Sequence, residues 1–140
     1  MKRTFSIGGV HPADNKISRG CAIETLPTPP TVYISVSQHI GAPAKPIVAV
    51  GDKVLTGQPV AEPGGFVSAY IHSSVSGTVK SIGPRKDLAG NMQTCIEIQV
   101  EGDEWVEGID RTDTLVTEFT DDNKTIMDKI KMGGVVGLGG

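Results

Sequence analysis

Five side chains in this sequence have the chemistry to bind a metal ion or to take part in catalysis: His11, His39, His72, Cys21 and Cys95. Metal sites place such ligands in close pairs, as in C-x-x-C or H-x-H, and neither spacing occurs here. No G-x-S-x-G or similar nucleophile arrangement occurs either. We therefore predict no metal site and no catalytic residue. We expect His39 and His72 to serve as hydrogen-bonding groups at the ends of loops.

The cysteines and the C-terminal glycines each allow two interpretations. Cys21 and Cys95 are either two free, buried thiols of a cytosolic protein or a disulfide formed in an oxidising compartment, and we favour the free thiols. Gly137, Gly139 and Gly140 form a G-x-G-G pattern, which lets backbone amides approach a phosphate group without hindrance from side chains. Within this chain alone, we expect these glycines to form a disordered tail.

The composition predicts many short strands. The 140 residues include 18 glycines and 9 prolines but only six aromatic residues, which suits tight turns around a small aliphatic core. The net charge of −3 includes no basic block, so the sequence has no electrostatic signature of nucleic-acid binding. No apolar run reaches the length of a membrane span, and no signal peptide precedes His11. We expect a soluble chain.

Residues 48–82 are the organising stretch, with alternating apolar and polar positions on either side of glycine turns. We predict turns at Gly51-Asp52, at Gly57 and at Ser76-Gly77, where glycine can adopt a positive φ. β-Branched or alternating apolar residues predict further strands at 31–36, from Phe66 onward, and at 92–100. A loop over residues 83–91 is expected to lead into the last of these strands.

The character of the sequence changes after residue 105. Residues 121–132 predict a helix capped by Thr120 or Asp121, with acids in its first turn, lysines in its last turn and a stop at Gly133. Its apolar stripe has no visible partner in the remaining sequence. We therefore expect the chain to stop inside a further domain.

The organising stretch resembles the biotinyl/lipoyl carrier pattern, with V-x-V-G-D-x-V-x-x-G-Q followed later by S-G-T-V. The resemblance implies a barrel-sandwich hybrid built from two similar halves. Carrier domains place a modified lysine at the hairpin between the halves. Here Phe66-Val67-Ser68 occupies that hairpin, and no lysine occurs between Lys53 and Lys80. We therefore expect the carrier fold without carrier chemistry.

Longer stretches are similar to the RnfC family, a component of the Rnf electron transport complex. These are residues 5–12 (FSIGGVHP), 37–46 (SQHIGAPAKP), 65–69 (GFVSA), 71–79 (IHSSVSGTV) and 132–140 (MGGVVGLGG). The last of them looks like the start of that family's glycine-rich flavin loop. The resemblance covers nearly the whole chain.

The resemblance implies a ferredoxin:NAD⁺ oxidoreductase subunit, peripheral on the cytoplasmic side of the inner or plasma membrane, in a complex that transports Na⁺ or H⁺. Its expected partners are NADH and the other Rnf subunits, and its expected cofactors are FMN, NAD(H) and two [4Fe-4S] clusters in the full-length protein. Gly137, Gly139 and Gly140 would contribute to flavin binding. Because the chain has no C-x-x-C-x-x-C motif, we expect an N-terminal fragment that is a structural or docking module, holds no cofactor and has no redox activity alone.

The predicted fold is mainly β: an irregular segment over residues 1–30, a barrel-sandwich hybrid domain over 31–105, and a linker and helix over 106–140. The last part would lead into a truncated α/β flavin- and NADH-binding domain. One alternative is an unmodified lipoyl-like scaffold with no redox role. A lysostaphin-type zinc endopeptidase requires an H-x-H pair that is missing. A glucose-type phosphotransferase domain requires two facing histidines, for which His39 and His72 are the candidates.

Overall fold

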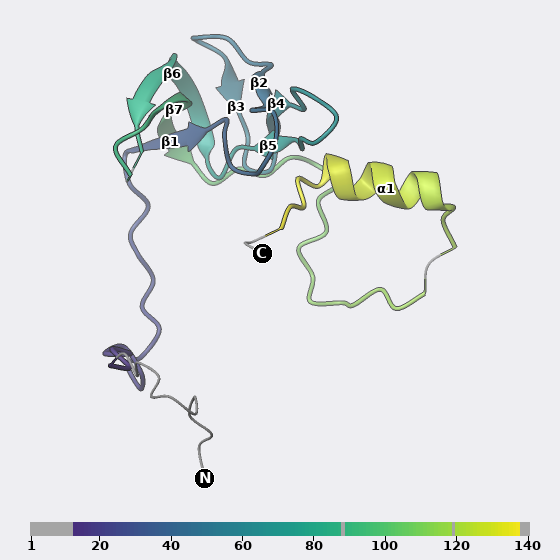
Figure 1. The fold of residues 1–140 in the computed structure, drawn as a ribbon, viewed down its shortest axis with the longest axis horizontal. Helices are drawn as coiled ribbons and strands as arrows, with labels where there is room; N and C mark the ends of the chain where they lie inside the picture. Colours follow the sequence, from purple (N-terminus) through teal and green to yellow (C-terminus); the bar gives the residue numbers. More distant parts are fainter. Residues whose placement is uncertain (1–12, 88, 119, 138–140) are drawn as a thin grey trace, which may run out of the picture.

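Two small antiparallel sheets and one helix make up the regular part of the computed structural model, which describes residues 13–87, 89–118 and 120–137 (Figure 1). The elements in chain order are β1 (Thr31–Ser35), β2 (Lys45–Pro46), β3 (Lys53–Val54), β4 (Pro59–Glu62), β5 (Ile71–His72), β6 (Ser76–Lys86), β7 (Met92–Gly102) and α1 (Asn123–Met132). One sheet has the order β1-β7-β6-β3 and the other β2-β4-β5. The mainly β prediction is confirmed, as is a single C-terminal helix among the described residues.

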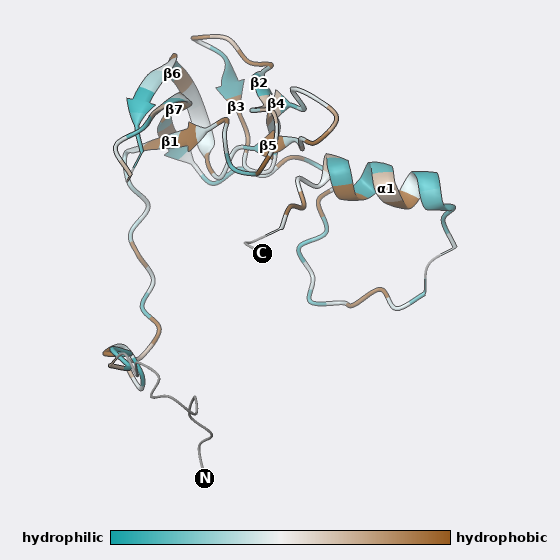
Figure 2. Cartoon of the chain, in the orientation of Figure 1, coloured by the Kyte–Doolittle hydropathy of each residue, from teal (hydrophilic) through white to brown (hydrophobic). Residues whose placement is uncertain are grey.

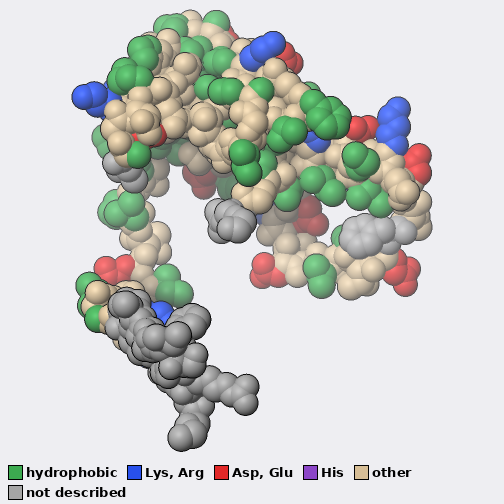
Figure 3. All heavy atoms as spheres, viewed as in Figure 1, with side chains coloured by type: hydrophobic (Ala, Val, Ile, Leu, Met, Phe, Trp, Pro, Cys, Tyr) green, Lys and Arg blue, Asp and Glu red, His purple; other side chains and the backbone are tan. Residues whose placement is uncertain are grey.

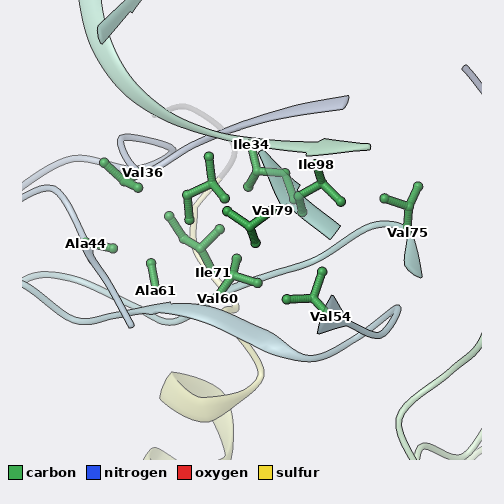
Figure 4. Close-up of a cluster of buried hydrophobic side chains, with 11 residues drawn as sticks. Ile34, Val36, Ala44, Val54, Val60, Ala61, Ile71, Val75, Val79 and Ile98 are labelled. Atoms are coloured by element: carbon green, nitrogen blue, oxygen red, sulfur yellow. The ribbon is translucent and has the colours of Figure 1, made fainter. Parts of the chain in front are cut away.

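The core lies between the two sheets and is almost entirely aliphatic (Figure 4). In β7 the alternation works as predicted, because Ile96 and Ile98 are fully buried while Glu97 between them faces outward. Ile98 stands opposite Val79 of β6 in the ladder, and Val79 is also fully buried. Val54, Val60 and the other members of the cluster come from both sheets, so burial of these side chains holds the sheets together.

The predicted turn at Ser76-Gly77 is wrong, because both residues lie inside the long strand β6. Gly77 stands opposite Val100 of β7 and has no positive φ. A Cβ built on Gly77 would lie 2.0 Å from the carbonyl oxygen of Gln99. Glycine is present here because the two backbones approach closely, which is a different use of glycine from a turn. The predicted turns at Gly51 and Gly57 are confirmed, and both residues have positive φ.

Two other strand boundaries differ from the prediction. β6 continues to Lys86, so the expected loop over residues 83–91 shortens to the turn that follows Lys86. The side chain of Asp87 accepts hydrogen bonds from the backbone N–H groups of Ala89 and Asn91 and organises this turn. Phe66 does not begin a strand, because regular pairing starts only at Ile71.

Residues after β7 remain attached to the sheets for several positions. The backbone N–H of Thr56 donates to the carbonyl of Glu104, and the N–H of Val106 donates back to the carbonyl of Thr56. The guanidinium of Arg111 lies 4.4 Å from the centre of the Trp105 ring. These contacts lie on both sides of residue 105, and the domain boundary there stays a prediction.

Helix α1 begins later than predicted. Its cap is Asp122, whose carboxylate accepts a 2.7 Å hydrogen bond from the N–H of Thr125, and not Thr120 or Asp121. Because the helix starts after both aspartates, its first turn contains no acid, contrary to the prediction, while Lys129 and Lys131 lie in its last turn as expected. Gly133 ends the helix, also as expected.

The N-terminal segment over residues 13–30 is irregular as predicted, is exposed throughout and extends away from the sheets (Figure 1). Cys21 lies on it and is exposed, so the prediction of a buried thiol is wrong for this residue. Cys95 is half-buried on β7, and both cysteines are free thiols. No helix within the described residues is both long enough and apolar enough to cross a bilayer.

Candidate functional site

A groove of about 800 Å³ lies between helix α1 and two loops of the β domain. One wall is formed by residues 39–40 and 66–69, the second of which is the hairpin where a carrier domain would place its lysine. The other wall is formed by Met127, Asp128, Ile130 and Lys131 of α1 and by residues 135–137. The groove therefore joins the predicted contact edge at Phe66-Val67-Ser68 to the helix that had no visible partner in the sequence.

The two loops of the first wall are held together along their length. Gly41 has a φ of +98°, and a Cβ on it would lie 2.2 Å from the carbonyl oxygen of Val67. The N–H of Ala42 donates to that same oxygen at 3.1 Å. The hydroxyl of Ser68 donates to the carbonyl of Ala42 at 2.9 Å and accepts from the N–H of Gly64 at 3.0 Å. These contacts hold the hairpin in one position.

His39 completes this connection with both of its ring nitrogens. The backbone N–H of Ala69 donates to Nε2 at 3.3 Å, and Nδ1 lies 3.0 Å from the carbonyl oxygen of Ile40. Because Nε2 accepts, the neutral ring carries its proton on Nδ1 and donates it to Ile40. The prediction that His39 is a hydrogen-bonding group of a loop is confirmed. With both nitrogens engaged, His39 is not available as the nucleophile of a phosphotransferase.

The second wall touches the β domain near the end of the helix. The N–H of Tyr70 donates to the carbonyl of Lys131 at 3.4 Å, and Gly134 packs against the carbonyl of Tyr70 and the ring of His72. No residue of α1 is buried. The helix is thus attached at its C-terminal end, while its apolar residues Met127 and Ile130 line the groove.

The exposed side chains of the groove are mainly apolar. Phe66 is 101% exposed and Ile40 is 89% exposed on the loop wall, and Met127 is 69% exposed on the helix wall. Figure 3 shows hydrophobic side chains over helix α1 and the adjoining loop, and Figure 2 shows apolar segments in the same parts of the ribbon. Asp128 and Lys131 contribute one charge of each sign. Such a surface binds by burial of apolar area, because it offers no set of catalytic groups.

A second, polar depression of about 370 Å³ lies on the outer face of the larger sheet, next to Tyr33 and Arg85. The Arg85 guanidinium stacks 3.4 Å from the centre of the Tyr33 ring. Hydrogen bonds from the hydroxyls of Ser81 and then Tyr33, and the charge of Arg85, hold the pKa of Glu97 below its ordinary value. These partners satisfy one another across β1, β6 and β7. We interpret the cluster as support for the sheet.

The predicted cofactor-binding glycines are only partly placed. Gly137 lies at the end of the groove, is exposed, and has no atom within 4 Å of a Cβ built on it. Gly139, Gly140 and His11 lie outside the described residues. The described residues thus provide no cradle that would fit a flavin phosphate. Within the same residues, no three His, Cys, Asp or Glu side chains lie close enough together to hold a metal ion.

The groove as a whole was not predicted from the sequence, although its loop wall was. The signal was present in residues 37–46 and 65–69, which were identified as the most distinctive motifs and which the structure places against each other. Ile40 within the first motif is an exposed apolar residue in an otherwise polar and proline-rich loop. The contribution of α1 had no comparable signal.

Comparison with known proteins identifies relatives of the chain. It is 43% identical, over all of its length, to the C subunit of the proton-translocating ferredoxin:NAD(+) oxidoreductase complex of Clostridium ljungdahlii. It is 38% identical over 95% of its length to the C subunit of the Na(+)-translocating ferredoxin:NAD(+) oxidoreductase complex of Acetobacterium woodii. It is 36% identical over 99% of its length to the C subunit of the ion-translocating oxidoreductase complex of Rhodobacter capsulatus.

The chain spans 30%, 30% and 27% of these three relatives, less than a third of each. The model of the family described as the RnfC barrel sandwich hybrid domain matches residues 4–103, well over half of the 140 residues. The match includes both sheets, the two loops of the groove wall and most of the N-terminal segment. The chain therefore belongs to the RnfC barrel sandwich hybrid domain family.

Proposed function

We propose that this chain is the platform region of the RnfC subunit in an ion-translocating ferredoxin:NAD⁺ oxidoreductase complex. In this role it takes part in electron transport as a scaffold, positioning the redox-active part of a longer polypeptide. The other subunits of the complex and NADH are the proposed partners of the whole protein. The complex is membrane-associated, and this region is peripheral to the membrane.

The observation that carries the scaffold role is the state of the hairpin at residues 66–69. A carrier domain presents a lysine there on an exposed turn, but this hairpin has none and is tied to the neighbouring loop through Ser68 and His39. A hairpin fixed in this way favours a stationary contact surface over a mobile arm. The family match supports the placement within RnfC.

We propose that redox chemistry belongs to polypeptide beyond this region. In the full-length protein FMN, NAD(H) and two [4Fe-4S] clusters would supply electron transfer. Gly137, Gly139 and Gly140 would begin the loop that approaches the flavin phosphate through backbone amides. The described residues supply no such cradle themselves. Their part is to hold the start of that loop next to α1.

The test compares the full-length protein with residues 1–140. We expect flavin absorbance and NADH-dependent dye reduction from the full-length protein and neither from residues 1–140. Mass spectrometry is expected to show no lipoyl or biotinyl adduct on either. Activity in residues 1–140, or an adduct, would contradict the scaffold role. The alternative, a lipoyl-like scaffold with no redox role, predicts a full-length protein without flavin.

A further inference from the structure

The groove beside α1 is an exposed apolar surface that no described residue covers. Ile40, Phe66 and Met127 face it from opposite sides and are 89%, 101% and 69% exposed. Neighbouring large apolar side chains in such number are uncommon on a free surface and mark places where another surface packs. The first step of the inference is that the groove is occupied in the working protein.

The helix gives an independent reason to expect an occupant. It has 10 residues and none of them is buried. Isolated helices shorter than about 12–15 residues are marginal in water, so most helix stability in proteins comes from packing of an apolar side. Met127 and Ile130 supply that side here, and they point the requirement for packing at the groove. An occupant that contacts them would stabilise α1 as well as itself.

The path of the chain indicates which occupant is present. Val135, Val136 and Gly137 follow the helix and themselves line the groove. The relatives are more than three times as long as this chain, which spans 30% of two of them and 27% of a third. In a protein of that size, polypeptide continuing beyond residue 140 starts only a few residues from the groove. Its short tether gives it a high effective concentration there, against which a separate protein would have to compete.

We propose that the groove is the seat of the polypeptide that continues beyond residue 140, so that a later part of the same protein packs against Phe66, Ile40 and Met127. This inference rests on the proposed function, which places the chain in a longer RnfC protein. The occupant presents apolar side chains to the walls of the groove. At the rim it presents charges complementary to Asp128 and Lys131. The groove is then an internal joint of the protein, and the hairpin without the carrier lysine serves as half of that joint.

Photocrosslinking in the full-length protein tests the proposal. Phe66 is replaced by p-benzoylphenylalanine, which keeps an aromatic ring at a fully exposed position and so leaves the fold intact. The matched control places the same group at Val50, which is 63% exposed and does not line the groove. A third variant at Ile40 gives a second reporter on the same wall. Each purified protein, without other subunits present, is irradiated and its crosslinked peptides are identified.

The expected result is an intramolecular crosslink from positions 66 and 40 to peptides beyond residue 140, and no such crosslink from position 50. Three results would overturn the proposal: a crosslink between two copies of the chain, a crosslink only to another subunit in the assembled complex, or no crosslink above that of the Val50 variant. The electron-transfer assay on the same preparations tests the proposed function separately. An intramolecular crosslink without NADH-dependent activity would refute the function and keep the joint, and the reverse pattern would refute only the joint.

Discussion

The backbone of Gly41 lies directly against the carbonyl of Val67, so that a Cβ on Gly41 would stand 2.2 Å from the Val67 oxygen. This approach joins two loops that are far apart in the sequence and forms one wall of the apolar groove. The N–H of Ala42 donates to the same oxygen, so the contact is also a hydrogen-bonded one. The shape of the groove therefore depends on the absence of a side chain at position 41.

Gly41→Ala is expected to destabilise the protein by about 2–3 kcal/mol, because the added methyl group must push the two loops apart. Urea unfolding measures the change. Gly51→Ala is the matched control, since Gly51 has nearly the same φ of +97° but no atom within 4 Å of its Cβ position. The control isolates backbone strain, at about 1 kcal/mol. Equal losses in both variants would show that the contact with Val67 contributes nothing.

Gly77→Ala is expected to cost about 3 kcal/mol, because its Cβ would lie against the backbone of β7 and break the central ladder. The clash is with the carbonyl oxygen of Gln99, at 2.0 Å. Gly83→Ala, in the same strand with no atom within 4 Å, serves as the control and is expected to stay within about 0.5 kcal/mol of the parent. Equilibrium urea denaturation compares the three proteins. A tolerated alanine at position 77 would contradict the close approach of β6 and β7.

The pKa of Glu97 provides a prediction of pH dependence. The hydroxyl of Ser81 is the largest cause of its lowered pKa, followed among the lowering causes by the hydroxyl of Tyr33 and the charge of Arg85. Because the folded pKa lies below the ordinary value of 4.5, the stabilising contribution is fully present above that value and is lost as the pH falls through the folded pKa.

Ser81→Ala is expected to raise the pKa of Glu97 toward its ordinary value and to shift acid unfolding of the larger sheet to higher pH. NMR titration of the Glu97 carboxyl carbon measures the change directly. The carboxyl of Asp110 is a reference, because its pKa is lowered through Thr112 and has no contact with Ser81. If the Glu97 titration is the same in both proteins, the hydrogen bond of 2.6 Å from Ser81 has no electrostatic role.

Asp122→Ala is expected to weaken α1 by about 1 kcal/mol through loss of its N-cap. The amide of Thr125, which donates to the Asp122 carboxylate, should then exchange faster with solvent. Asp121→Ala removes the exposed ion pair with Lys129 instead and is expected to change exchange at Thr125 much less. Hydrogen exchange followed by NMR separates the two. Faster exchange at Thr125 only in the Asp121 variant would place the cap at the residue that the sequence pattern favoured.

Several features of this protein could be predicted from sequence because they depend on neighbours in the chain. Alternation in residues 92–100 correctly placed Ile96 and Ile98 in the core, since successive side chains of a strand face opposite sides. Gly133 correctly marked the end of the helix. The missing lysine excluded carrier chemistry without reference to any structure, because an amide linkage needs an amine.

Other features required the tertiary structure because they depend on residues that are distant in the chain. The glycine of Ser76-Gly77 looks the same in a turn and beside a close strand, and only the position of Gln99 distinguishes the two. Nothing in residues 37–46 shows that His39 accepts a hydrogen bond from Ala69. The groove exists only because these loops and the apolar side of α1 meet in space. Sequence alone therefore determined the fold class and the absence of a carrier arm, whereas long-range contacts decided which surface is left open for docking.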